Sequence, residues 1–257
     1  MTDVHPAAAK GFSRSADTYV RGRPDFPPAA LDWLREDLGM RADRTVIELG
    51  AGRGKFTRLL AETGAAVTAV EPVATMLERL VRDLPGVAAL RGEAQHIPLP
   101  DASADAVVCA QAFHWFATRA VLAEIRRVLK PGGVLGLIWN IRDESVAWVR
   151  ELTAIMAPYE GDAPRYYNGE WRGVFPAPGF GELHERAFPH AHAGSPEQVI
   201  VDRVASVSFI AALPDAQRAR VLEEVRRLIE STPELSGRAS VAMPYVTRAY
   251  WCRRAAS

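Results

Sequence analysis

The sequence VIELGAGRGK, residues 46–55, is an apolar run that ends in a glycine-rich turn. Such a run is typical of a buried strand, and glycine lets a ligand approach bare backbone because it has no Cβ. A second apolar run, residues 66–70, ends at Glu71, and an ionised Glu accepts hydrogen bonds from both hydroxyls of a ribose. Together with the amides of a helix that starts at the turn, the pattern predicts a nucleoside ligand. A tight strand-to-helix turn without a ligand is the alternative.

The glycine spacing separates two classes of nucleoside ligand. The dinucleotide fingerprint places its third glycine at the sixth position of the turn, below a bound pyrophosphate. Counted from Gly50, that position holds Lys55, and the third glycine is Gly54 at the fifth position. Glu48 precedes the turn, and its carboxylate would repel a pyrophosphate but attract a ligand that carries an ammonium and a sulfonium. The spacing disfavours a nicotinamide dehydrogenase, and here the chain resembles the class I S-adenosylmethionine-dependent methyltransferases.

Two later segments carry the same resemblance. A predicted helix over residues 117–129 runs into LKPGG, residues 129–133, where proline stops the helix and glycine makes the turn; the family's fifth strand begins at this place. Residues 92–105 resemble the family's loop after strand three, in which an acidic side chain and the next backbone amide contact the adenine. Glu93 and Ala94 occupy these positions, with Glu where the family more often has Asp. A surface loop is the alternative for this segment.

The N-terminal segment resembles that of the small-molecule branch that includes trans-aconitate methyltransferase-like proteins. Residues 12–24 hold Tyr19 and an Arg-Pro pair at Arg23, and in those enzymes this segment folds over the cofactor. The resemblance implies that S-adenosylmethionine is bound and leaves as S-adenosylhomocysteine. It assigns the cofactor contacts to Tyr19, Arg23, Glu48, Gly50, Gly52, Gly54, Glu71, Pro72, Met76, Glu93, Ala94 and Gln111. For Met76, packing in the core is the alternative.

Short apolar runs alternate with helical patterns from residue 29 onward, which argues for a parallel sheet covered on both faces. We therefore expect an α/β fold, a Rossmann-like seven-stranded and mostly parallel sheet with helices on both faces. The resemblance adds an antiparallel last strand between strands five and six. Strands are expected near residues 45–49, 66–70, 87–91, 105–110, 133–139, 183–189 and 241–253. Helices are expected near residues 29–38, 54–63, 73–83, 117–129, 196–212 and 214–230.

Residues 141–182 break this alternation with aromatic residues among prolines and glycines. That composition suits a lid over a pocket, because aromatic rings give a large contact area at low entropic cost. We predict a cofactor-covering segment 1–28, a cofactor-binding core 29–140, a lid-like insertion 141–182, and completion of the sheet by 183–257. Candidate substrate contacts in the insertion are Trp148, Tyr166, Tyr167 and Trp171. For each of them, a hydrophobic cluster that props the insertion against the sheet is the alternative.

The fourth predicted strand ends at Gln111 and is followed by His114 and Trp115. Ligands of open α/β sheets bind at the carboxyl ends of the strands, and from this position the family addresses the transferable methyl. His114 is the titratable side chain there, and an ordinary histidine pKa suits a general base for a hydroxyl or a carbon acid. A carboxylate acceptor needs no base. We take His114 as the candidate catalytic residue, and His114 and Trp115 as substrate contacts; a structural role is the alternative for His114.

Composition limits the possible partners. Lysine and arginine number 31, as do aspartate and glutamate, so the formal net charge is zero, which argues against a nucleic-acid partner. Cys109 and Cys252 have no metal-ligand spacing, and neither a metal site nor a disulfide framework is predicted. Without a long apolar stretch or a signal-peptide pattern, we expect a cytoplasmic protein, monomer or homodimer, away from the membrane.

The sequence thus predicts an S-adenosylmethionine-dependent methyltransferase that acts on a small molecule. The acceptor would be a carboxylate, or an oxygen, nitrogen or carbon centre of a metabolite. Two alternatives stay open. One is an RNA or protein methyltransferase, and the other is a non-methylating protein of the same fold that binds S-adenosylmethionine.

Overall fold

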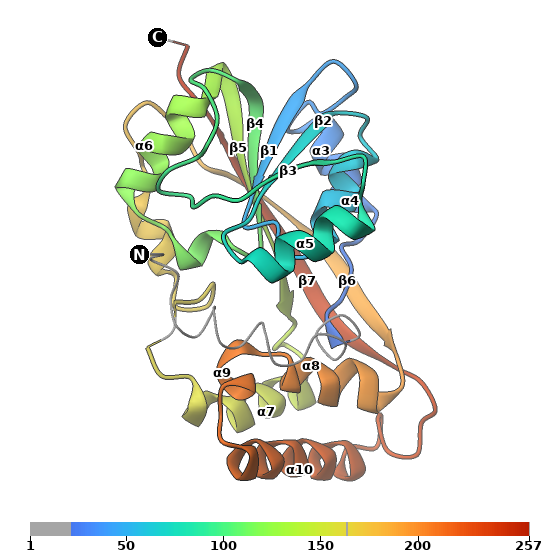
Figure 1. Cartoon of the computed structure of the whole chain (residues 1–257). Helices are drawn as coiled ribbons and strands as arrows, with labels where there is room; N and C mark the ends of the chain where they lie inside the picture. Colours follow the sequence, from blue (N-terminus) through green and yellow to red (C-terminus); the bar gives the residue numbers. More distant parts are fainter. Residues whose placement is uncertain (1–21, 163, 257) are drawn as a thin grey trace.

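A computed structural model describes residues 22–162 and 164–256 of the 257-residue chain (Figure 1). Its strands form one seven-stranded sheet with the order β3-β2-β1-β4-β5-β7-β6. β7 runs antiparallel to both of its neighbours, and the other pairs are parallel. The predicted sheet, with its antiparallel last strand between strands five and six, is confirmed. The bounds are β1 Thr45–Leu49, β2 Ala66–Val70, β3 Ala88–Leu90, β4 Ala104–Ala110, β5 Leu129–Arg142, β6 His184–Gly194 and β7 Val241–Arg253.

Helices cover both faces of the parallel part of the sheet. α3 (Ala29–Glu36), α4 (Lys55–Ala61) and α5 (Ala74–Asp83) lie on one face, and α6 (Arg119–Val128) lies on the other (Figure 1). The side chains of β1 and β4 alternate between the two cores: Val46 and Val108 join α3 and α4, whereas Ile47 and Val107 join α6. Burial on both faces explains why these strands read as unbroken apolar runs.

β5 is longer than the sequence predicts. The apolar run ends at Trp139, but β5 pairs residue by residue with β7 up to Arg142, which lies opposite Tyr245. The polar residues Asn140 and Arg142 are therefore held in strand geometry and are buried. Periodicity missed this extension, because the pairing with a long antiparallel neighbour, rather than local sequence, holds the strand there.

A separate helical layer lies beyond one end of the sheet (Figure 1). We use this name for α7 (Ala147–Met156), the π-helix η4 (Glu197–Val201), α8 (Asp202–Ala205), α9 (Ser208–Ala211) and α10 (Asp215–Ser231). These helices share one hydrophobic cluster with the first residues of β7, including Val241 and Tyr245. The helix predicted over 196–212 is thus divided into three short pieces, whereas the predicted 214–230 helix corresponds to α10.

The predicted lid-like insertion 141–182 is not confirmed as one unit. Its α7 belongs to the helical layer, together with segments after residue 194. Residues 166–180 instead pack against the sheet core beside α6, and Trp171 and Val174 are buried in it. The aromatic residues of the insertion are therefore divided between two hydrophobic cores.

No helix among the described residues is long and apolar enough to cross a membrane.

Candidate active site

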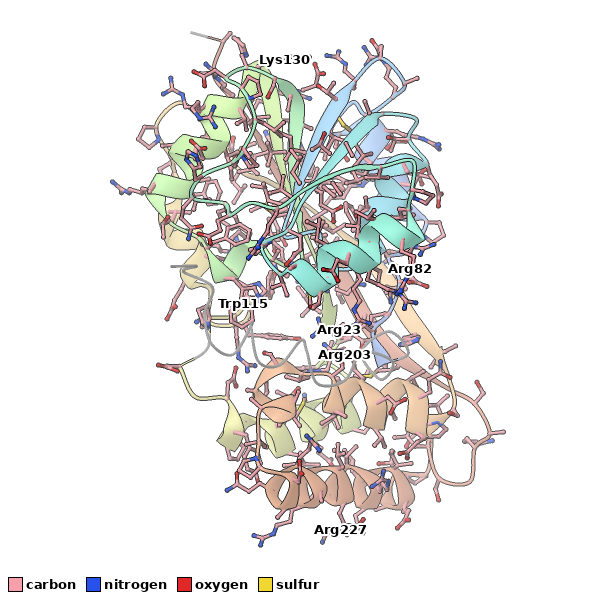
Figure 2. The ribbon with its side chains drawn as sticks, viewed as in Figure 1. Arg23, Arg82, Trp115, Lys130, Arg203 and Arg227 are labelled. Atoms are coloured by element: carbon pink, nitrogen blue, oxygen red, sulfur yellow. The ribbon has the colours of Figure 1, made fainter. Side chains whose placement is uncertain are left out.

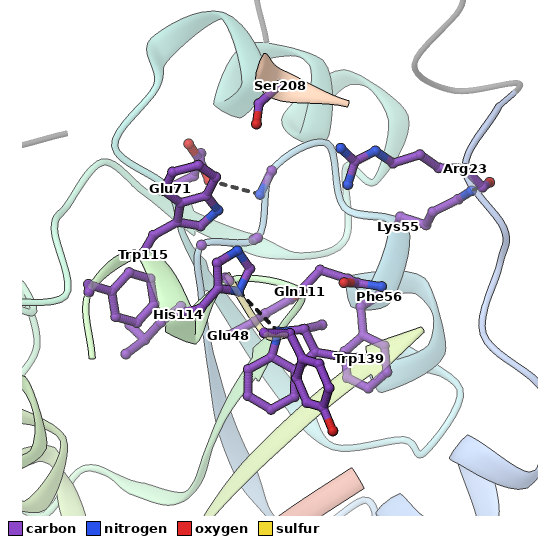
Figure 3. Close-up of a pocket in the computed structure, with 18 of the residues that line it drawn as sticks. Arg23, Glu48, Lys55, Phe56, Glu71, Gln111, His114, Trp115, Trp139 and Ser208 are labelled. Carbon is purple, nitrogen blue, oxygen red and sulfur yellow. Dashed lines mark hydrogen bonds between the residues drawn. The ribbon is translucent and has the colours of Figure 1, made fainter. Parts of the chain in front are cut away.

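A cavity of about 310 Å³ lies at the carboxyl ends of the parallel strands, between the sheet and the helical layer (Figure 3). This is where an open α/β sheet places its ligand. Most of the site residues predicted from the sequence line it: Arg23, Glu48, Gly50, Gly52, Glu71, Pro72, Met76, Glu93, Ala94, Gln111, His114, Trp115, Tyr166 and Tyr167. Gly54, Trp148 and Trp171 do not line it, and Tyr19 lies outside the described residues.

The glycine turn forms one wall of the cavity. Gly50, Gly52 and Gly54 all have positive φ, at 71°, 57° and 81°, a conformation that glycine adopts without strain. A Cβ on Gly52 would meet no atom within 4 Å, so the space beside it belongs to the cavity. The Gly52 amide donates a hydrogen bond to Glu71 Oε2 over 2.9 Å (Figure 3). The carboxylate at the end of β2 thereby holds the turn in place.

Gly54 has a packing role. A Cβ there would lie 2.8 Å from Leu84 Cδ1 and 3.1 Å from Leu80 Cγ, so a larger residue would force these leucine side chains to move. Because Gly54 caps α4 in a left-handed conformation, it allows α4 to start directly against α5. The assignment of Gly54 as a lining residue is therefore not supported, since the third glycine of the turn faces the helix packing.

Two carboxyl groups lie close to the turn. Glu48 is 1% exposed and accepts a hydrogen bond from Thr57 Oγ1 over 2.5 Å, and burial raises its pKa to about 8. Burial also raises the pKa of Glu71, against two backbone amides, those of Val73 and Gly52, that stabilise its charge. A cation that enters the cavity would favour the ionised form of both groups.

The segment before α3 is fastened over the cavity edge by polar contacts. Lys55 Nζ forms an ion pair with Asp25 over 3.1 Å and donates to the carbonyl of Arg23. Arg23 Nη2 donates to the carbonyl of Ser206 over 3.1 Å, and so joins this segment to the helical layer. Lys55, which occupies the glycine position of the dinucleotide fingerprint, thus organises the chain that closes this side of the site.

His114 lies on a 3-10 helix, η1 (Phe113–Trp115), just beyond β4. Its Nδ1 accepts a hydrogen bond from Trp139 Nε1 over 3.1 Å (Figure 3). Burial first, and then the positive charges of Arg23 and Arg165, lower the pKa of His114 to about 3. Since an indole N–H only donates, the neutral imidazole must carry its hydrogen on Nε2.

Gln111 sets the backbone path from β4 to His114. Its φ is 57°, an uncommon conformation for a residue other than glycine. The Gln111 amide donates to the carbonyl of Ile138 over 2.8 Å, and its side chain donates to the carbonyl of Asn140 over 3.2 Å. These bonds to β5 hold the turn that brings His114 to the cavity, so Gln111 lines the site and also shapes it.

The predicted aromatic contacts separate into two groups. Tyr166 and Tyr167 reach the cavity, and the Tyr167 hydroxyl accepts a hydrogen bond from the Arg142 amide over 3.1 Å. Trp171 instead packs on Trp139, with ring centroids 4.7 Å apart. Trp148 is buried in the core of the helical layer. Both tryptophans therefore have the structural role that the sequence left open, because each fills a core that the insertion itself must build.

Several lining residues were missed by sequence reasoning. Asn140 and Arg142 follow the apolar part of β5, and their place at the carboxyl end of a parallel strand was a signal that could have revealed them. Arg165, Arg203 and Phe209 also line the cavity. These three come from the insertion and the helical layer, and no local pattern marks them. Among the described residues, no cluster of His, Cys, Asp and Glu could hold a metal ion.

Comparisons with known proteins agree with this geometry. The model of a methyltransferase domain family matches residues 47–137. An uncharacterized methyltransferase of Mycobacterium tuberculosis is 42% identical over 247 residues, which cover 96% of this chain and 97% of that protein. An uncharacterized methyltransferase-like protein of Schizosaccharomyces pombe is 36% identical over 242 residues, 94% of each chain. A solved structure from Anaeromyxobacter dehalogenans, provisionally named a type II methyltransferase, has a TM-score of 0.62 at 24% identity and covers 91% of this chain and 97% of its own.

The family match spans the strands, the glycine turn and the loop with Glu93, which are the parts that build one side of the cavity. The two relatives extend this likeness over nearly the whole chain, including the helical layer. The narrower resemblance to trans-aconitate methyltransferases is not confirmed by these comparisons. The chain belongs to the class I S-adenosylmethionine-dependent methyltransferases.

Proposed function

We propose that this methyltransferase binds S-adenosylmethionine against the glycine turn and methylates a small molecule held on the opposite side of the same cavity. The observation that carries the proposal is the continuity of the cavity, which runs from the glycine turn past His114 to the helical layer. We call residues 48–53, 70–76 and 92–95 its cofactor half. We call residues 114–116, 139–142, 164–167 and 203–209 its acceptor half.

The cofactor half suits a nucleoside with a cationic amino-acid end. Gly52 leaves open space where any other residue would place a Cβ, and Glu48 and Glu71 are acids whose charged forms need a cationic or hydrogen-bonding partner. Glu71 would bind the ribose hydroxyls through the lone pairs that the two amides leave available. Glu93 and Ala94 would bind the adenine. Met76, which is only 5% exposed, would pack beside it.

The acceptor half positions the group to be methylated. S-adenosylmethionine supplies a methyl group on a sulfonium, and the protein must align that methyl with the acceptor atom. His114 presents Nε2–H to the cavity, because Trp139 occupies Nδ1. We therefore assign His114 as a hydrogen-bond donor that orients the acceptor, in place of the general base considered from the sequence. A base would need a free lone pair directed at the substrate.

The proposal is tested by two measurements on the purified protein. Calorimetry should show saturable binding of S-adenosylhomocysteine, and S-adenosylmethionine labelled in its methyl group should transfer the label to an acceptor in a panel of carboxylic acids, phenols and amines. Binding of the cofactor without turnover of any acceptor would favour the non-methylating alternative. Label in tRNA or protein, with none in small molecules, would overturn the small-molecule assignment.

A further inference from the structure

The acceptor half contains arginines that approach from three separate segments. Arg142 lies at the end of β5, Arg165 in the segment before η3 (Glu170–Val174), and Arg203 on α8 of the helical layer. All three line the cavity. In Figure 2, Arg203 lies between the sheet and the helical layer, whereas Arg227 lies on the far side of α10. The fold therefore brings three positive charges to one place.

Arg142 is the least expected of the three. Arg142 is 8% exposed. Among the described residues, none accepts a hydrogen bond from its buried Nε, and none forms an ion pair with its guanidinium. Its nearest aromatic partner is Tyr167, whose ring centroid lies 5.8 Å from Arg142 Cζ. Proteins almost always pair a buried charge. A buried arginine at a cavity wall, without an ion-pair partner in the described part of the chain, therefore indicates that a ligand supplies the pair.

Arg165 and Arg203 also have N–H donors that no described residue pairs with, which supports the same conclusion. Arg165 forms an ion pair with Glu160 over 2.5 Å and stacks on Phe209 at 4.1 Å, yet no described residue pairs with its Nε. Burial, together with the charge of Arg142, lowers the pKa of Arg165 against the influence of Glu160. Arg203 has no partner among the described residues for Nε or Nη1.

The acidic residues of the cavity are confined to one side of it, although Arg23, Arg53 and Lys55 also line the cavity outside the acceptor half. The acidic residues that line it, Glu48, Glu71 and Glu93, all belong to the cofactor half. Among the described residues, the acceptor half has no acidic lining residue and adds two donors to its arginines. These are His114 Nε2–H and the Tyr167 hydroxyl, which keeps its hydrogen at neutral pH. Tyr167 is 46% exposed and lines the cavity, so its surface is accessible to a ligand. An anionic group with several oxygen acceptors complements this wall.

We propose that Arg142, Arg165 and Arg203 bind an oxyanion group, a carboxylate or a phosphate monoester, of the methyl acceptor. This inference rests on the proposed function, because it names the substrate class of the same cavity. Guanidinium groups bind either oxyanion through paired N–H donors. The aromatic side chains Trp115, Tyr166 and Phe209, which line the same cavity, would pack against the organic part of the molecule. The acceptor is an organic anion, which excludes neutral and purely cationic acceptors.

The test measures binding of anions to the protein already saturated with S-adenosylhomocysteine. The probes are benzoate, trans-aconitate and phenyl phosphate, with benzamide as the neutral counterpart of benzoate. At about ten times its dissociation constant, a bound anion should raise the melting temperature by about 2–6 °C, and benzamide should leave it unchanged. A larger shift with the two carboxylates or with phenyl phosphate identifies which oxyanion the wall binds.

The variants Arg142→Gln and Arg203→Gln should each weaken anion binding by about tenfold or more. Arg142→Lys should retain part of the affinity. Arg227→Gln, at an exposed position on α10, is the matched control and should bind the anions as the wild type does. Affinity for S-adenosylhomocysteine should stay the same in all four. If Arg142→Gln does not fold, Arg203→Gln still decides the question, because Arg203 is only partly buried.

Three results would overturn the inference: equal stabilisation by benzamide and benzoate, anion shifts that persist in both glutamine variants, or no shift with any of the anions. Failure of the proposed function looks different. In that case the wild-type protein would not bind S-adenosylhomocysteine at all. A protein that binds S-adenosylhomocysteine but ignores every anion would keep the proposed function and lose only this assignment of the acceptor.

Discussion

The two halves of the cavity are built from different kinds of structure. The cofactor half comes from turns that directly follow β1, β2 and β3, so each of its residues is fixed by the strand before it. The acceptor half is assembled from β5, the segment 164–167 and the helical layer, which are far apart along the chain. The halves also differ in charge, because the lining glutamates all belong to the cofactor half, which also holds Arg53, whereas the acceptor half holds three arginines and no acidic residue among its described lining residues. A local construction keeps the cofactor contacts constant, whereas an assembled wall can change its specificity without altering the turn.

Gly52→Val should produce the largest effect and should damage only the cofactor half. The branched side chain would fill space beside the turn at a backbone φ of 57°, so we expect affinity for S-adenosylhomocysteine to fall by roughly a hundredfold or more. Gly132→Val is the matched control, because Gly132 also has positive φ, at 75°, and open space around it. Gly132 is two residues after Lys130 in the sequence, and Figure 2 shows Lys130 at the end of the sheet away from the cavity.

Calorimetric titration of both glycine variants, with circular dichroism as a check of folding, separates backbone strain from loss of the binding site. Equal loss of affinity in the two variants would mean that strain, rather than occupied ligand space, is responsible. If Gly52→Val bound S-adenosylhomocysteine with wild-type affinity, the glycine turn would not be part of the cofactor site.

The difference between the halves also explains what the sequence could predict. The turn at 50–54, Glu71 and the loop at Glu93 were all found, because a glycine pattern or a strand-ending acid marks each of them locally. The strands β1 to β5 were likewise predicted, since doubly covered strands are unbroken apolar runs. The family resemblance supplied the antiparallel direction of β7 and its place between strands five and six.

The acceptor half escaped prediction for a physical reason. Arg203 and Phe209 face the cavity only because α8 and α9 pack on the end of β7, and no spacing in the sequence reports such a contact. Trp148 and Trp171 were misplaced because an aromatic residue in an irregular segment can fill a core or line a pocket with equal chemical ease. Arg142 could have been predicted as a cavity residue, because it follows an apolar strand. The apolar run ends before Arg142, however, so the strand was predicted to be too short to include it.

Glu48→Gln should change the pH dependence of stability in the cofactor half. In the folded protein without cofactor, the pKa of Glu48 is raised from 4.5 to about 8, so the unfolded chain loses this proton at lower pH than the folded protein does. The free energy of unfolding should fall by up to about 1.4 kcal/mol per pH unit between these two values. Below the unfolded pKa this contribution is fully present, and it is lost as the pH rises through about 8.

Glutamine keeps the shape of the protonated acid but does not titrate. Thermal melts from pH 5 to pH 8.5 should therefore show Glu48→Gln gaining stability relative to the wild type as the pH rises. Glu151→Gln, which alters an exposed residue of α7, should run parallel to the wild type. Parallel curves for all three proteins would show that Glu48 is ionised in the folded state.

Glu71→Ala should weaken S-adenosylhomocysteine binding by about 1.5–3 kcal/mol, the scale of hydrogen bonds to a charged group. The loss has two sources, the ribose contact proposed here and the amides of Gly52 and Val73 that Glu71 holds. Anion binding in the acceptor half should persist at saturating S-adenosylhomocysteine. Glu62→Ala, an exposed residue at the end of α4, serves as the control in calorimetry. An effect below a few tenths of a kcal/mol would place Glu71 outside the cofactor site.

The smallest effect should come from His114, where the two halves meet. If its Nε2–H donates to the acceptor, His114→Ala should lower kcat/KM by about tenfold, and His114→Gln, which keeps a side-chain N–H, should recover most of that loss. If His114 were a general base, His114→Ala and His114→Gln should lower kcat/KM to the same extent. Because the pKa of His114 is lowered to about 3, the wild-type kcat/KM should show no histidine titration between pH 5 and pH 8. An inflection near pH 6.5 that disappears in His114→Gln would restore the base and overturn the assignment of His114 as a donor.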